Sequence, residues 1–92
     1  MKSHMYSKKY RVEKIEEFHR HNPLYDDMEG NICYLVYLNI GERGWMLYET
    51  GAWYDIPHRI HTSVIEDITY TDDQVIVKTQ NTRFTFTLIR KE

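Results

Sequence analysis

Hydrophobic side chains alternate with polar ones over most of the second half of the chain. Residues 83–88 alternate strictly, and residues 74–80 have the same period of two. Such alternation is typical of β-strands that bury one face. A two-residue turn at residues 81–82 would pair Thr79 with Phe84 and Val77 with Phe86, so that the apolar residues of both strands share one face. The pattern therefore predicts a β-hairpin at the C-terminal end.

The segment before this hairpin continues the same face. A turn at residues 72–73 pairs Tyr70 with Val75, and it places Asp67 opposite Lys78 on the polar side. A slip of one residue would expose the whole apolar set, so pattern and turn spacing support one register. We expect three antiparallel strands, a C-terminal meander.

An earlier hairpin is expected in residues 32–49. A turn centred on residues 42–43 sets Ile40 against Trp45 and Leu38 against Leu47. The strand at residues 32–40 is apolar or aromatic on both faces, whereas antiparallel sheets usually leave one face to solvent. We therefore expect this hairpin to be covered on both sides.

The first segment favours a helix from about residue 8 to residue 21. Val12, Ile15 and Phe18 recur three apart, and acidic residues stand four positions before basic ones, as on a helix surface. The competing interpretation is a strand in which Tyr10 and Val12 alternate with charged residues. A helix here would serve as the cover for the hairpin.

Together these elements predict an α+β fold. An N-terminal helix would pack on a curved antiparallel sheet of about five strands, with a small open barrel as a variant and a short strand at residues 52–56 as a connection. Residues 1–4 have the look of an expression-tag remnant, because a second methionine follows a Ser-His pair. We expect residues 5–92 to form a single domain.

Composition places the chain among globular domains and narrows the partner classes. It has 92 residues, of which 41% are hydrophobic and 28% charged, and a net charge of −2. This balance disfavours direct nucleic-acid binding, since phosphate neutralisation needs a basic surface. Cys33 stands alone in an apolar context, so we expect a buried thiol, no disulfide and no cysteine-based zinc site. Without a membrane-spanning run or a signal peptide, we expect a cytoplasmic protein.

The aromatic residues carry the clearest functional signal. Phe, Trp and Tyr make up 14% of the chain, more than a small core readily buries. Tyr, Trp and Arg are enriched in protein-binding hot spots because they offer large contact areas with polar tips. The sequence predicts a non-enzymatic protein-binding module without metal or cofactor, and the candidate contact residues are Arg43, Trp45, Tyr48, Trp53, Tyr54, Asp55, His58 and Arg59.

Other functions stay open at this point. Asp55, His58 and His61 could form the centre of a metal-dependent or general acid–base hydrolase or nuclease. The aromatic residues could instead stack single-stranded bases. Exposed aromatics and edge strands also permit a homodimer.

The C-terminal strands resemble a known group of proteins. Residues 61–68 (HTSVIEDI) and 75–84 (VIVKTQNTRF) are similar to a hairpin of small phage and prophage accessory proteins, although Phe84 stands where that pattern often has tyrosine. The group includes anti-CRISPR and other anti-defence inhibitors. The resemblance implies a mobile-element protein that occludes a site on a host defence protein, such as a CRISPR effector, in the host cytoplasm.

Overall fold

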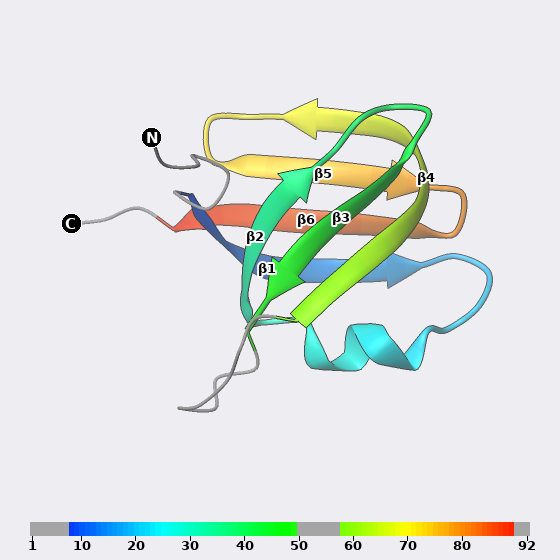
Figure 1. Cartoon of the computed structure of the whole chain (residues 1–92), viewed down its shortest axis with the longest axis horizontal. Helices are drawn as coiled ribbons and strands as arrows, with labels where there is room; N and C mark the ends of the chain where they lie inside the picture. Colours follow the sequence, from blue (N-terminus) through cyan, green and yellow to red (C-terminus); the bar gives the residue numbers. More distant parts are fainter. Residues whose placement is uncertain (1–7, 50–57, 90–92) are drawn as a thin grey trace.

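The described chain is a closed β-barrel. The computed structural model describes residues 8–49 and 58–89, in which each strand pairs antiparallel with the next and β1 also pairs with β6 (Figure 1). In chain order the elements are β1 (Lys9–Glu17), the 3-10 helix η1 (Pro23–Asp27), β2 (Ile32–Tyr37), β3 (Arg43–Tyr48), β4 (His58–Tyr70), β5 (Gln74–Thr79) and β6 (Thr82–Ile89).

The predicted α+β fold is wrong, because the described residues contain no α-helix and the N-terminal segment is mainly strand β1. The cause is a β-bulge. The register of β1 along β6 shifts between Val12 and Lys14, which leaves Glu13 as an extra residue. The bulge brings Ile15 to the side of the strand that packs on the core, the same side as Val12. Because of the bulge, Val12 and Ile15 lie three residues apart on the same side of a strand. This spacing is also typical of a helix, which explains the wrong prediction.

The predicted C-terminal meander is confirmed by strands β4, β5 and β6. Tyr70 lies opposite Val75 and Asp67 opposite Lys78, as the turn at residues 72–73 requires. The next turn is displaced, so that Val77 faces Phe84 rather than Phe86. A displacement by two residues keeps every side chain on its own face, which is why the predicted buried face survives the error.

The predicted register of the earlier hairpin is wrong. Trp45 lies opposite Tyr37 and Leu47 opposite Tyr34. Strand β2 ends at Tyr37, and residues 38–42 form a loop instead of continuing the strand.

That loop turns away from β3 and hydrogen-bonds to β4. The Gly41 backbone N–H donates to the carbonyl of Ile65 at 2.8 Å, and the Ile65 N–H donates to the Glu42 carbonyl at 2.9 Å. Gly41 has a φ of 91°, a conformation that favours glycine. Two backbone groups of the loop, the Gly41 N–H and the Glu42 carbonyl, are thus paired with β4.

Aromatic rings fill one end of the barrel. Phe84 and Phe86 stack with centroids 5.9 Å apart, and Tyr25 of η1 meets Phe84 edge-on at 5.2 Å. Asn22 begins η1 by accepting a hydrogen bond from the Leu24 N–H. The 3-10 helix η1, below the strands in Figure 1, thus contributes Tyr25 to the core of the barrel. Other buried residues of the core are Val12, Met28, Cys33, Met46, Tyr48, Ile60, Ile65, Val75 and Val77.

The predicted tag remnant at residues 1–4 and the predicted short strand at residues 52–56 lie outside the described residues. Within the parts of the chain that the structure describes, no helix has the length and apolar character that crossing a bilayer requires.

Candidate functional site

The outward side chains of β2, β3 and the first half of β4 form an aromatic surface. On β3, Gly44, Met46 and Tyr48 are buried, so the intervening Trp45 and Leu47 point outward. Across the sheet, Trp45 lies between its neighbours on β2 and β4, and so does Leu47. We name this surface the aromatic face; it consists of Tyr34, Tyr37, Arg43, Trp45, Leu47, Arg59 and His61.

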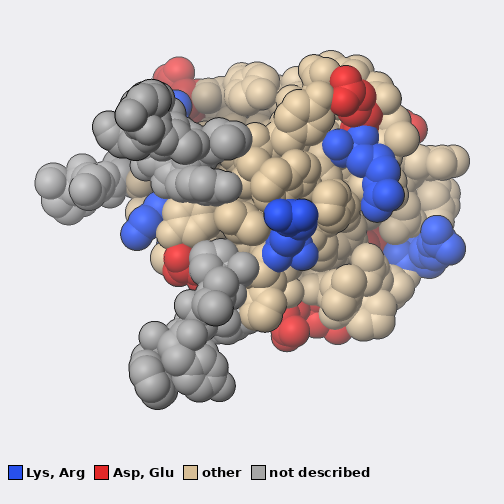
Figure 2. Space-filling model, viewed as in Figure 1, with Lys and Arg blue, Asp and Glu red and all other residues tan. Residues whose placement is uncertain are grey.

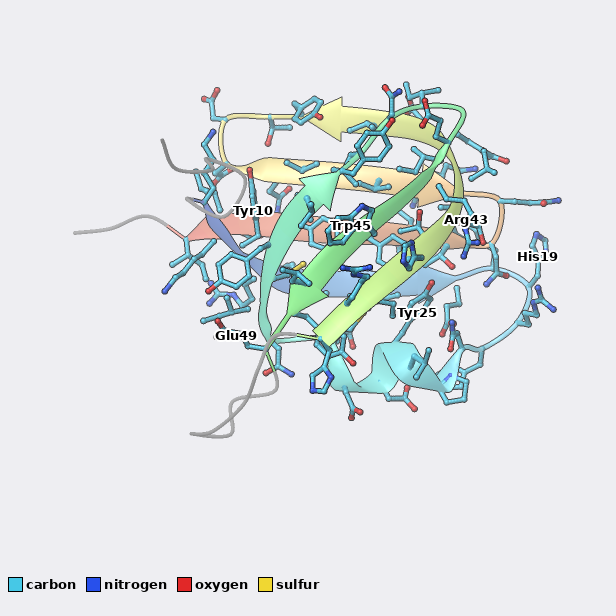
Figure 3. All side chains as sticks on the ribbon, in the orientation of Figure 1. Tyr10, His19, Tyr25, Arg43, Trp45 and Glu49 are labelled. Atoms are coloured by element: carbon cyan, nitrogen blue, oxygen red, sulfur yellow. The ribbon has the colours of Figure 1, made fainter. Side chains whose placement is uncertain are left out.

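Trp45 occupies the middle of the aromatic face, with Arg43 toward one end and Glu49 toward the other (Figure 3). The Cζ atom of Arg59 lies 4.6 Å from the centroid of the Trp45 ring. The ring of His61 lies 6.2 Å away at an interplanar angle of 34°. Attraction between a guanidinium and the indole quadrupole stabilises this arrangement and fixes Arg59 over the ring.

Arg43 is held by a bulge in β4. The register shifts between Arg43, opposite Val64, and Trp45, opposite His61, so β4 contains one extra residue there. The Nε–H of Arg43 donates to the carbonyl of Thr62 at 2.9 Å. The bulge thus provides the acceptor that orients this side chain.

Tyrosines on the β2 side of the face are bound to carboxylates. The Tyr34 hydroxyl donates to Glu49 and the Tyr37 hydroxyl to Glu42, each at 2.6 Å. The hydrogen bond to Glu49, assisted by burial, raises the pKa of Tyr34 to about 12. The hydrogen bond to Glu42 likewise raises the pKa of Tyr37, while it lowers that of Glu42. Both hydroxyls therefore stay protonated at neutral pH and keep the two carboxylates at the β2 side.

The charges of the aromatic face are divided by sign. The arginines lie on β3 and β4, and the carboxylates lie at the two ends of β3 next to the β2 tyrosines. Figure 2 shows this side of the molecule as mostly uncharged, with a separate blue group near the middle and another blue group that adjoins red near the upper edge. Among the described residues, neither Arg43 nor Arg59 has a carboxylate within 4.0 Å.

The structure brings together three of the predicted contact residues, Arg43, Trp45 and Arg59. Tyr48 does not join them, because it points inward and is buried, and its ring lies 5.5 Å from that of His58. Trp53, Tyr54 and Asp55 lie outside the described residues.

Four members of the aromatic face were not predicted as contact residues: Tyr34, Tyr37, Leu47 and His61. The signal that could have found them is their cross-strand position beside Trp45 and Arg59. This position can be derived only from the correct β2–β3 register, which the sequence pattern did not provide.

The histidines proposed for a hydrolase do not converge. His58 and His61 are three residues apart on a regular stretch of β4, so they point to opposite sides of the strand. His58 packs near Tyr48, and His61 near Trp45. Asp55, the third proposed member, lies outside the described residues. In residues 8–49 and 58–89, no three His, Cys, Asp or Glu side chains come together as a metal-binding group.

A polar cleft of about 280 Å³ lies between the β1–η1 loop and the β5–β6 turn. His21 stands at this cleft, with Nδ1 2.7 Å from Glu17 and Nε2 3.2 Å from Asp26. Both ring nitrogens are occupied by carboxylates, so His21 fixes the loop and is not placed to act as a general base. The cleft is lined by Arg20, His21, Asn22, Pro23, Tyr25, Ser63, Asn81 and Thr82.

Comparisons with protein-family models, with curated proteins and with solved structures found no match for this chain.

Proposed function

We propose that this protein is a small non-enzymatic binding module that holds another protein against its aromatic face. The observation that carries the proposal is Trp45, central on the face, with Arg59 over its ring and Tyr37 beside it on β2. Tyr37 is 42% exposed, and Arg43, Arg59 and His61 are exposed as well. Tryptophan, tyrosine and arginine at the centre of a surface are the usual anchors of a protein interface.

A protein partner fits this surface better than a single-stranded nucleic acid. Base stacking needs an open ring face, and one face of Trp45 is covered by Arg59. A phosphate backbone needs a continuous positive track, whereas Glu42 and Glu49 stand at the β2 side of the face. A surface with both signs of charge complements the mixed charges of a protein.

The resemblance to small phage accessory proteins indicates the kind of partner. Within this proposal, the protein acts as a stoichiometric inhibitor, and the aromatic face occludes a site on a host defence protein. Such an activity needs a rigid surface and no catalytic group, which agrees with a closed barrel whose strands position the face.

Site-specific photo-crosslinking in cells that naturally make the protein tests the binding surface. A benzophenone amino acid replaces Leu47 on the aromatic face or, as a matched control, Thr85 on the outer side of β6. We expect the Leu47 position to give a covalent adduct with one protein and the Thr85 position to give none. Equal adducts from both positions, or an adduct that nuclease removes, would overturn the proposal. An adduct of only two copies of this chain would replace it with a homodimer.

A further inference from the structure

We propose that the aromatic face selects an acidic partner segment, in which two carboxylate side chains bind Arg43 and Arg59. This inference rests on the proposed function and specifies the chemistry of the partner. It follows from how the two guanidinium groups are held and from the charges that surround them.

Arg59 is oriented without being neutralised. Its guanidinium lies over the Trp45 ring, 4.6 Å from the centroid, and the indole carries no charge. A guanidinium stacked on an aromatic ring keeps the N–H donors at its edge available for a carboxylate. Arg59 is therefore already placed for a charged hydrogen bond, and little side-chain entropy remains to be lost on binding.

Arg43 is held in a comparable way by a neutral group. Its Nε–H is used by the Thr62 carbonyl at 2.9 Å, while its side chain stays exposed. The terminal nitrogens carry the remaining donors of the guanidinium. This side chain is also fixed in direction and keeps its full charge.

Cations on the opposite side of the barrel form ion pairs with neighbouring carboxylates. Arg83 lies 3.2 Å from Glu16, and Lys78 lies 2.9 Å from Glu66. The described residues offer no carboxylate at such a distance to either arginine of the aromatic face. A partner that covered these two arginines without supplying negative charge would bury unpaired ions, which is costly. Complementary carboxylates remove that cost, so the face favours an acidic partner over a neutral one.

The positions of the arginines also define the spacing of the partner's acidic groups. On β3, Arg43 lies two residues before Trp45, and Leu47 lies two residues after Trp45. Arg59 of β4 lies opposite Leu47. Their backbone positions are separated by about 13 Å along the strand at about 3.3 Å per residue. Arg59 holds its guanidinium over Trp45, which lies closer to Arg43 along β3 than Leu47 does. An extended segment with carboxylates four residues apart, and an apolar side chain midway between them over Trp45, matches this arrangement.

NMR titration with defined peptides tests the inference. The probe is an acetylated, amidated heptapeptide, Ser-Glu-Thr-Leu-Thr-Glu-Ser, and its control carries glutamine in place of both glutamates. We expect the glutamate peptide to shift the Nε–H signals of Arg43 and Arg59 and the indole N–H of Trp45. Its affinity should exceed that of the glutamine peptide by about tenfold, as two solvent-exposed ion pairs predict.

Three variants identify the groups responsible. Arg43→Gln and Arg59→Gln should each reduce the preference for the glutamate peptide from about tenfold to about threefold, because each removes one of two ion pairs. Arg83→Gln, on the opposite side, should leave the preference unchanged. Equal affinity for both peptides would overturn the inference, and so would a loss of preference with Arg83→Gln as large as that with Arg43→Gln or Arg59→Gln. Neither outcome would overturn the proposed function, which the crosslink at Leu47 tests separately. If oligothymidine shifts the same signals more strongly, and salt abolishes its effect, both the acidic-segment inference and the proposed function fail.

Discussion

The backbone N–H of Gly44 donates a 2.9 Å hydrogen bond to the Oγ1 atom of Thr62, and both residues are buried. The bond joins β3 to the bulge in β4, and the same Thr62 offers its carbonyl to Arg43. One threonine thus satisfies a buried donor and orients an arginine of the aromatic face. The inner packing of the barrel and the geometry of the candidate site are therefore coupled at this position.

Replacement of Thr62 by valine should destabilise the protein. Valine keeps the volume of threonine but removes Oγ1, which leaves the Gly44 N–H buried without its acceptor. An unsatisfied buried donor costs about 1–3 kcal/mol. Urea denaturation measures the loss. Ser63→Ala, at the exposed neighbouring position, should change stability by less than about 0.5 kcal/mol. Equal unfolding midpoints for the two variants would contradict the assignment.

Gly44 should tolerate no side chain. A Cβ atom there would lie 2.8 Å from Ile65 Cδ1 and 2.8 Å from the Tyr37 carbonyl oxygen. The carbonyl belongs to the backbone of the neighbouring strand and cannot move cheaply. We expect Gly44→Ala to cost about 1–3 kcal/mol, as overpacked positions do. Gly41→Asn is the comparison, because that site has open space and asparagine tolerates a positive φ. If the Gly44 variant is as stable as the Gly41 variant, position 44 has room for a side chain and the prediction is wrong.

The sequence pattern identified the strands of the C-terminal meander, in which hydrophobic and polar residues alternate regularly, and it failed at β1, where a bulge intervenes. The turn at residues 72–73 gave the correct β4–β5 register because no bulge lies between Asp67 and Tyr70. Glu13 shifted the phase of β1, and apolar residues three apart then indicated a helix. A bulge adds a residue without a signature in composition, so periodicity alone cannot locate it.

The candidate site was predictable in part for a related reason. Residue type alone identified Trp45, Arg43 and Arg59 as potential anchors. Their tyrosine neighbours depend on the β2–β3 register, which the loop at residues 38–42 determines through hydrogen bonds to β4. Those bonds join residues distant in sequence, and no local pattern reports them.

Arg59→Ala should change the surroundings of Trp45 with little effect on stability. An exposed cation–π contact contributes about 0.5–1 kcal/mol, so the free energy of unfolding should fall by no more than that. The indole N–H resonance of Trp45, assigned with a Trp45→Phe variant, should move because the guanidinium leaves its ring. Arg83→Ala, as a control, should leave this resonance in place. A large loss of stability with Arg59→Ala would make Arg59 a structural residue.

Cys33 should be unreactive in the folded protein. It is fully buried, and burial raises the pKa of its thiol to about 12, so almost no thiolate forms at neutral pH. Thiolate is the reactive species. A disulfide reagent at pH 8 should label the thiol only after urea unfolds the barrel, and the labelling rate should follow the unfolded fraction. Rapid labelling of the native protein would show that the β1–β2 side of the barrel opens.

The contribution of His21 to stability should depend on pH in a defined window. Hydrogen bonds to Glu17 and then Asp26 raise the pKa of His21 above its ordinary 6.5. That contribution is complete below pH 6.5 and is lost as the pH rises through the raised value. Burial raises the pKa of Glu17, but hydrogen bonds from the Asn22 backbone and from His21 outweigh it, and the net pKa is below 4.5. The contribution of Glu17 is complete above pH 4.5 and is lost as the pH falls through the lowered value.

The stability difference between the wild-type protein and His21→Gln should therefore be greatest between pH 4.5 and 6.5. It should shrink at alkaline pH, where the imidazole is neutral, and at strongly acidic pH, where Glu17 is protonated. Urea midpoints measured across this range give the profile, and His19→Gln serves as the matched substitution in the same loop. A difference that is constant with pH would mean that His21 acts through packing, because only the ionised pair carries a pH-dependent contribution.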